Sequence, residues 1–195
     1  MERKKLIIDT DCGSDDAMAI AMALMDERYE ILFFSVCSGN VCADQAVLNT
    51  LTTIEYAGSY EPPVYLGSSL ALVKPLAFAH ETHGNDGMGD IGLLPRRLKR
   101  AEVNGILKML EALEKNAAGE IEIVALGPLT NLALAIRLAP ETMRRVKRIS
   151  IMGSAGLGTG NVTPASEFNI WQDPEAAKIV MESGLPLLFV GWDAC

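Results

Sequence analysis

The sequence predicts an α/β fold: an open, mostly parallel, Rossmann-like sheet with helices on both faces. Short apolar or β-branched runs of strand length alternate with longer segments of helical periodicity, which is typical of β–α units that wind a parallel sheet. Hydrophobic residues make up 49% of the 195 residues. A chain of this size can bury a core on both faces of a sheet, so we expect one domain over residues 1–195.

The amino-terminal half alternates regularly between strands and helices. We expect strands at residues 5–8, 31–36 and 64–66, and helices at 17–24 and about 43–57. The segment from Gly67 to about Arg100 has few periodic apolar positions. Because loops of this length in compact domains are usually functional or disordered, this segment is a candidate functional loop.

The carboxyl-terminal half resumes the pattern. We expect strands at residues 121–126, 146–152 and 187–190, and helices at about 102–115, about 129–138 and from 173 onward. Asp173 as N-cap and Pro174 at the first helical position mark the start of the last helix. A second long loop, residues 153–171, is rich in Gly, Ser, Thr and Asn.

Composition excludes several classes of partner. The net charge of -8, with only scattered Lys and Arg, disfavours nucleic acid and anionic membranes. Apolar runs are well short of the roughly 20 residues that a membrane helix needs. The four cysteines (Cys12, Cys37, Cys42 and Cys195) lack paired spacing, and no signal-peptide pattern precedes Lys4. We therefore expect a reduced, cytoplasmic protein without a transmembrane segment.

The acidic turn after the first strand carries the strongest chemical signal. Ligands of an open parallel sheet bind beyond the carboxyl ends of its strands, where Asp9, Asp11, Asp15 and Asp16 fall within eight residues. These carboxylates repel one another unless a cation is bound, and oxygen ligands suit Ca²⁺ or Mg²⁺ better than zinc. Alternatively, they cap the next helix and interact with its dipole, which accounts for one or two acids but poorly for four.

This turn resembles the amino-terminal signature of the calcium-dependent, inosine-uridine-preferring nucleoside hydrolases, with Cys12 where a Pro is usual. Further matches to the family follow in order along nearly the whole chain. They are Ser38-Gly39-Asn40-Val41, His83-Gly84-Asn85-Asp86-Gly87-Met88-Gly89, Ala125-Leu126-Gly127-Pro128-Leu129-Thr130-Asn131, Met152-Gly153, Glu167-Phe168-Asn169 and Asp173-Pro174-Glu175-Ala176-Ala177.

The resemblance implies hydrolysis of the N-glycosidic bond of ribonucleosides to free base and ribose. It implies Ca²⁺ as the cofactor, bound by the carboxylates of Asp11 and Asp16 and by the backbone carbonyl of Leu126. A calcium-bound water, its pKa lowered by the ion, would give a proton to Asp11 and attack the anomeric carbon. Nearby carboxylates would then stabilise the oxocarbenium-like ribosyl group.

The resemblance also assigns residues to a small-molecule ribonucleoside substrate. Asp15 and Asn169 are expected to hold the ribose hydroxyls, and Asn161 and Glu167 to reach the 5′ end of the sugar. These assignments predict that two loops distant in sequence meet at one sugar.

Three further substrate contacts have simpler alternatives. Asn40 is expected beside the sugar ring, but an Asn after a Gly can be just a turn residue. Met152 is expected to pack against the sugar, although a lone Met at a strand end is more often part of the core. His83 is expected near the rim of the leaving-group pocket, and could equally be a solvated loop histidine.

Two other functions compete with hydrolysis. An aspartate-nucleophile phosphotransferase of the haloacid dehalogenase type also has Asp-x-Asp after a strand, but expects Thr or Val where Gly13 stands. The second alternative is a catalytically impaired ribose- or nucleoside-binding remnant of the family. Family chains typically continue beyond the position of Cys195, and that part is expected to supply another Asp ligand, a His near the base, and more strands and helices. An uncovered sheet edge and apolar face would drive association, so we expect a homo-oligomer.

Overall fold

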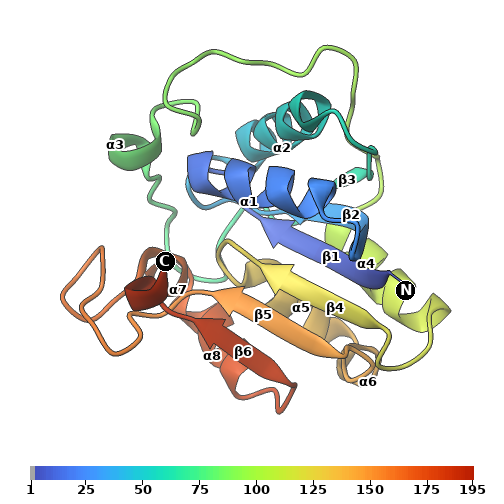
Figure 1. The fold of residues 1–195 in the computed structure, drawn as a ribbon. Helices are drawn as coiled ribbons and strands as arrows, with labels where there is room; N and C mark the ends of the chain where they lie inside the picture. The colour runs from blue at the N-terminus through green and yellow to red at the C-terminus, as the bar shows by residue number, and fades with distance from the viewer. Residues whose placement is uncertain (1–2) are drawn as a thin grey trace.

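The computed structural model describes residues 3–195 and has one sheet of six parallel strands in the order β3-β2-β1-β4-β5-β6 (Figure 1). The strands are β1 (Lys4–Thr10), β2 (Tyr29–Val36), β3 (Val64–Leu66), β4 (Ile121–Ala125), β5 (Arg148–Met152) and β6 (Leu187–Val190). The chain winds outward in both directions from β1 and β4, so the order reverses between these two strands. Ligand sites of open α/β sheets lie at such a switch point. The predicted fold class is confirmed.

Helices cover both faces of the sheet. The helices α1 (Ser14–Met25) and α2 (Ala43–Ala57) pack on one face, over the β1–β3 side. The opposite face is covered by α4 (Gly105–Lys115), α5 (Thr130–Leu138), α6 (Pro140–Met143) and α8 (Pro174–Met181). Strand alternation builds the two cores, because Ile8 of β1 packs toward α1 while Ile7 packs toward α4 and α5.

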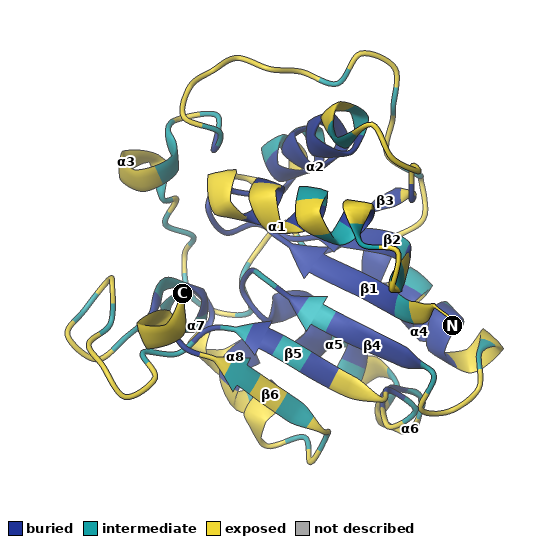
Figure 2. Cartoon of the chain, viewed as in Figure 1, coloured by how far each residue is buried: buried dark blue, intermediate teal, exposed yellow. Residues whose placement is uncertain are grey.

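The strands and the helix faces that pack on them are largely buried, as this layering requires (Figure 2). The helices α1 and α2 do not cover their face of the sheet along its whole width. Beyond these helices, Val124, Ser150 and Val190 line an open cavity instead of a helix interface. This face of the sheet, as well as the carboxyl ends of its strands, therefore lines the cavity. No helix among residues 3–195 is long and apolar enough to cross a membrane.

The predicted elements exist, but some bounds differ. The first strand extends to Thr10, so Asp9 belongs to the sheet, and the first helix begins at Ser14, so Asp15 and Asp16 occupy its first turn. The short helices α3 (His80–His83), α6 and α7 (Phe168–Gln172), and the 3₁₀ turn at Trp192–Ala194, were not predicted. They are too short to show a periodic apolar pattern.

Candidate metal and substrate site

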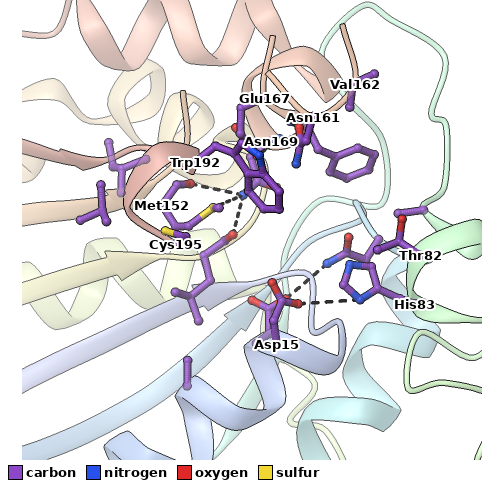
Figure 3. A pocket seen from close by; sticks show the side chains of 18 of the residues that line it. Asp15, Thr82, His83, Met152, Asn161, Val162, Glu167, Asn169, Trp192 and Cys195 are labelled. Carbon is purple, nitrogen blue, oxygen red and sulfur yellow. Dashed lines mark hydrogen bonds and ion pairs between the residues drawn. The ribbon is translucent and has the colours of Figure 1, made fainter. Parts of the chain in front are cut away.

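One cavity of about 790 Å³ brings together the residues that the sequence nominated (Figure 3). It extends from the carboxyl ends of the central strands over the β4–β6 side of the sheet. All of the predicted site residues except Asp11 line it: Asp15, Asp16, Asn40, His83, Leu126, Met152, Asn161, Glu167 and Asn169. The topology therefore gathers residues from six separate segments of the chain.

Asp11 lies directly behind this lining and is fully buried. Its Oδ2 accepts a hydrogen bond of 2.6 Å from the backbone N–H of Asn40. Its Oδ1 has no hydrogen-bond partner among residues 3–195. Gly39 and Gly127 make room for the carboxylate, since a Cβ at Gly127 would lie 2.6 Å from Oδ1 and one at Gly39 would overlap Oδ2. Oδ1 is thus an unpaired oxygen that faces the turn after β4.

Asp16 is held by three neighbours at the start of α1. Its Oδ1 accepts from Thr10 Oγ1 at 3.0 Å, and its Oδ2 accepts from the backbone N–H of Gly13 at 2.8 Å and from Asn40 Nδ2 at 3.3 Å. These bonds leave the side chain one orientation. Asn40 consequently bridges the two acids, with its backbone on Asp11 and its side chain on Asp16.

Burial perturbs both carboxylates. It raises the pKa of Asp11 well above the ordinary aspartate value, and the nearby charge of Asp16 raises it further. Burial likewise raises the pKa of Asp16 to about 7, with a smaller contribution from the charge of Asp15. Two buried acids in contact with the same groups cannot both ionise cheaply, whereas a cation between them favours the ionised form of each.

The oxygen donors around Asp11 fit a hard cation. Leu126 adds a backbone carbonyl at the turn that Asp11 Oδ1 faces, and this carbonyl accepts a bond of 2.6 Å from Asn169 Nδ2. Carboxylate and carbonyl oxygens are the ligands of Ca²⁺, which takes six to eight of them. In the described part of the chain, no three His, Cys, Asp or Glu side chains cluster as a metal site. Asp11, Asp16 and the Leu126 carbonyl are therefore the candidate oxygen donors to a metal ion.

Asp15 and His83 stand at the opposite, open side. The Asp15 side chain is 70% exposed, and its Oδ1 lies 3.8 Å from Nδ1 of His83. His83 is the last residue of α3, and its Nδ1 is 2.9 Å from the Oγ of Ser14. The histidine is therefore attached to the start of α1 and does not extend freely into solvent.

Asn169 links the wall of the cavity to the metal-facing turn. Its Nδ2 donates to the Leu126 carbonyl and lies 3.2 Å from the Met152 carbonyl and 3.4 Å from the Met152 sulfur. The end of β5 and the turn after β4 are thus joined by one amide. Met152, which the sequence left open between core and site, lies partly buried on the cavity wall.

Glu167 and Asn161 shape the far end of the cavity. Glu167 is the N-cap of α7; its carboxylate accepts from the backbone N–H of Asn169 at 2.7 Å and of Ser154 at 3.1 Å. Burial raises the pKa of Glu167 above its ordinary value. Asn161 is exposed and accepts a bond of 2.9 Å from the backbone N–H of Phe168. Both side chains are oriented by backbone contacts before any ligand arrives.

Comparison with known proteins decides the family. A sequence profile of the inosine-uridine preferring nucleoside hydrolases matches residues 6–195. The chain belongs to this family. The match favours the nucleoside hydrolase prediction over the phosphotransferase alternative.

Relatives of this nucleoside hydrolase chain include enzymes named for different bases. Uridine nucleosidase 1 of Arabidopsis thaliana is 44% identical over 97% of the chain and 56% of the relative. The solved structure of the plant nucleoside hydrolase PpNRh1 superposes with a TM-score of 0.93 at 39% identity, over 98% of this chain and 61% of that one. The purine-preferring ribonucleoside hydrolase of Gardnerella vaginalis gives a TM-score of 0.92 at 34% identity, over 97% and 61%. The chain spans less than two thirds of the length of these relatives.

Several cavity residues of the nucleoside hydrolase chain were missed by sequence reasoning. Trp192 and Cys195 follow β6 directly and line the cavity, so the strand-end rule applied to the last strand could have found them. Phe168 lies inside the matched Glu167-Phe168-Asn169 segment. Thr82 and Val162 come from the two long loops, where no periodic pattern indicates which side chain faces inward.

Proposed function

We propose that the chain hydrolyses the N-glycosidic bond of ribonucleosides to free base and ribose. The observation that carries this proposal is the buried carboxylate of Asp11, with an unpaired Oδ1 behind a cavity lined by all the other nominated residues. The family includes relatives named as a uridine nucleosidase and as a purine-preferring hydrolase, which supports ribonucleosides as the substrate class.

The nucleoside hydrolase family is generally metal-dependent, and we propose Ca²⁺ for this chain. Asp11, Asp16 and the Leu126 carbonyl would hold it, because Asp11 Oδ1 faces the turn that follows this carbonyl and Asn40 contacts both acids. When bound, calcium would lower the pKa of the attacking water and bind the ribose diol. The raised pKa values of both acids support this assignment, since a cation relieves the cost of their burial.

Asp11 acts as the general base in this proposal. The backbone N–H of Asn40 holds Oδ2, so the carboxylate cannot rotate freely, and Oδ1 is left to accept the proton of the attacking water. A general base must be oriented before the proton moves, and burial increases the basicity of a carboxylate. The two glycines that admit the carboxylate preserve this geometry.

The ribose is positioned between the acidic turn and the α7 end. Asp15, exposed toward the cavity, and Asn169 on the opposite wall are placed to bind hydroxyls, while Asn161 and Glu167 lie farther along for the 5′ end. As the glycosidic bond breaks, positive charge develops on the ribosyl ring. Fixed carboxylates around the ring stabilise that charge because they require no reorganisation.

The activity is tested by release of base from uridine and inosine in saturating calcium. We expect hydrolysis by the wild-type chain, loss after chelation, and recovery when calcium is restored. Calorimetric binding of uridine without release of uracil would instead support the alternative of a binding protein. Failure to bind or cleave any ribonucleoside would contradict both.

Self-association is also part of the proposal. β6 is an edge strand, and its side chains Leu188 and Val190 are 46% and 39% exposed. Exposed apolar edges pair readily with other chains. Sedimentation at micromolar concentration should show a homo-oligomer, and a clean monomer would contradict this part.

A further inference from the structure

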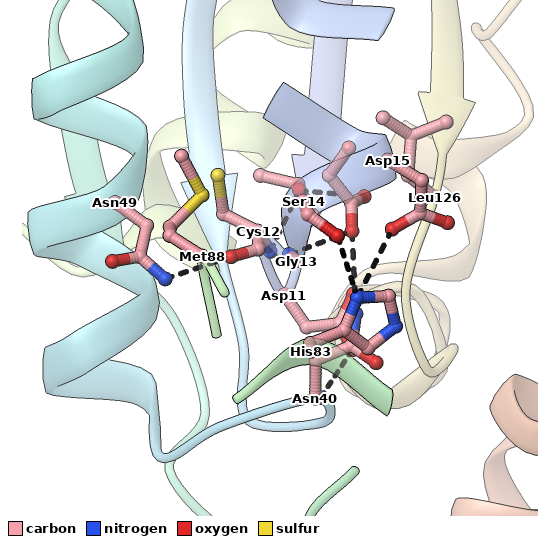
Figure 4. Close-up of polar contacts among 12 residues, drawn as sticks. Asp11, Cys12, Gly13, Ser14, Asp15, Asn40, Asn49, His83, Met88 and Leu126 are labelled. Carbon is pink, nitrogen blue, oxygen red and sulfur yellow. Dashed lines mark hydrogen bonds and ion pairs between the residues drawn. The ribbon is translucent and has the colours of Figure 1, made fainter. Parts of the chain in front are cut away.

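Ser14 contacts the imidazole of His83 in a way that no part of the family match explains. Ser14 is the first residue of α1, and its Oγ lies 2.9 Å from Nδ1 of His83 (Figure 4). Asp15 Oδ1 is 3.8 Å from the same nitrogen, too far for a hydrogen bond. The serine hydroxyl is therefore the group that bonds this face of the ring.

The tautomer of His83 and the direction of this hydrogen bond depend on each other. A serine hydroxyl has one proton to donate, and within residues 3–195 His83 is the only hydrogen-bond partner of Ser14 Oγ. Donation to Nδ1 makes that nitrogen an acceptor. A neutral imidazole that accepts at Nδ1 carries its proton on Nε2.

The imidazole of His83 also belongs to the cavity wall. His83 lines the cavity, its side chain is 14% exposed, and Figure 3 shows the ring beside Asp15 among the lining residues. Nucleobases carry oxygen and nitrogen acceptors, and a base departs faster when it receives a hydrogen bond. We propose that Ser14 donates this hydrogen bond to Nδ1 and is thereby a positioning residue that holds His83 with Nε2–H directed at the leaving base. This inference rests on the proposed function.

The loop that carries His83 is anchored independently of Ser14. Asn49 of α2 donates through Nδ2 to the carbonyl of Asp86 at 2.8 Å and to the carbonyl of Cys12 at 3.0 Å. This buried amide connects the loop to the acidic turn. Ser14→Ala should therefore leave the loop in place and release only the ring. Ser14→Thr keeps the hydroxyl and is the matched conservative variant.

The first test measures the tautomer directly, without turnover. The sequence has only two histidines, His80 and His83, so ¹⁵N-labelled imidazoles give two sets of signals, assigned with His80→Gln. We expect the Nε2–H form of His83 in the wild type and in Ser14→Thr, and a mixture of tautomers in Ser14→Ala. An unchanged tautomer in Ser14→Ala, or Nδ1–H in the wild type, overturns the proposal.

The second test compares leaving groups. Ser14→Ala should lower kcat for uridine by about tenfold, a fraction of the roughly 10²–10⁴-fold range of acid–base catalysis, with KM little changed. p-Nitrophenyl riboside, whose leaving group needs no proton, should be much less affected, and Ser14→Ala should add nothing in a His83→Ala background. Equal slowing of both substrates would overturn the positioning role. If no riboside is cleaved, the proposed function fails, and the tautomer measurement alone decides on Ser14.

Discussion

The two sides of the candidate site differ in how they are built. On one side Asp11 and Asp16 are buried, fixed by backbone and side-chain hydrogen bonds, and shifted in pKa. On the other side Asp15 is 70% exposed and meets His83 from a long loop. The adjacent residues Asp15 and Asp16 thus belong to different sides of the site, because the first turn of α1 directs Asp16 inward and Asp15 outward.

In the proposed function, metal binding and proton transfer belong to the buried side, and substrate contact belongs to the open side. A charge is stabilised best by groups that are already oriented and shielded from water. Substrate entry, in contrast, requires exposed groups on loops that vary in length and sequence. Substitutions on the two sides are therefore expected to differ in their effects.

The largest effect is expected at Asp11. Asp11→Ala should lower kcat for uridine by roughly 10²–10⁴-fold, because the general base and a proposed calcium ligand are lost together. Asp44→Ala is the matched control, since the Asp44 side chain is 80% exposed on α2 and is not part of the cavity lining. Steady-state rates in saturating calcium measure both. Similar rates for Asp11→Ala and the wild type would refute Asp11 as the base.

The second prediction separates Asp16 from its neighbour Asp15. Asp16→Asn should weaken calcium binding at least about tenfold, because ligand charge sets calcium affinity. Asp15→Asn should leave calcium affinity nearly unchanged and raise KM for uridine, since Asp15 faces the cavity. Calorimetric titration of calcium into each variant makes the comparison. Equal loss of affinity in both would show that the exposed and buried acids are not functionally distinct.

The fold could be predicted because its signals are long and periodic. Six apolar runs and the helices between them define the sheet, and the Asp173-Pro174 pair located the start of α8 correctly. The short helices α3, α6 and α7 gave no such signal, because four or five residues cannot display a helical period.

The residues of the site could be predicted from the sequence, but their arrangement in space could not. Strand-end position and motif matches named nine residues that line one cavity, although their catalytic roles stay predictions. Which acid is buried depends on contacts between segments that are distant in sequence. Gly39 and Gly127, in the turns after β2 and β4, lie against the Asp11 carboxylate. The contact between Ser14 and His83 joins positions 69 residues apart, and local pattern cannot show it.

The third prediction concerns stability against pH in the absence of metal. Burial raises the pKa of Asp9 to about 7, whereas an unfolded aspartate titrates near 4. The folded state therefore binds more protons between these values, and the Asp9 contribution to the free energy of unfolding falls as pH rises from about 4 to about 7. Asp9→Asn removes this loss. Its stability relative to wild type should rise by on the order of a few kcal/mol between pH 5 and pH 7.5.

Urea unfolding of both proteins at the two pH values measures this difference. Asp44→Asn is the exposed control, and its stability relative to wild type should change little over the same range. A constant difference between Asp9→Asn and wild type would show that the burial of Asp9 does not shift its titration.

The smallest effect is expected far from either side of the site, at the N-cap of α4. Asn104 Oδ1 accepts from the backbone N–H of Ile106 at 2.9 Å, and its Nδ2 donates to the carbonyl of Gly67 at 3.2 Å, where the long loop begins. Asn104→Ala should lower the free energy of unfolding by about 1 kcal/mol, because a helix loses its cap. The rate on uridine should not change, since Asn49 anchors the loop at Asp86, close to His83 and far from Gly67.

Asn104→Asp keeps the cap oxygen and loses only the donor, so urea unfolding of both variants separates the cap from the loop anchor. A fall in kcat shared by both variants would show that the start of the loop positions the open side of the site.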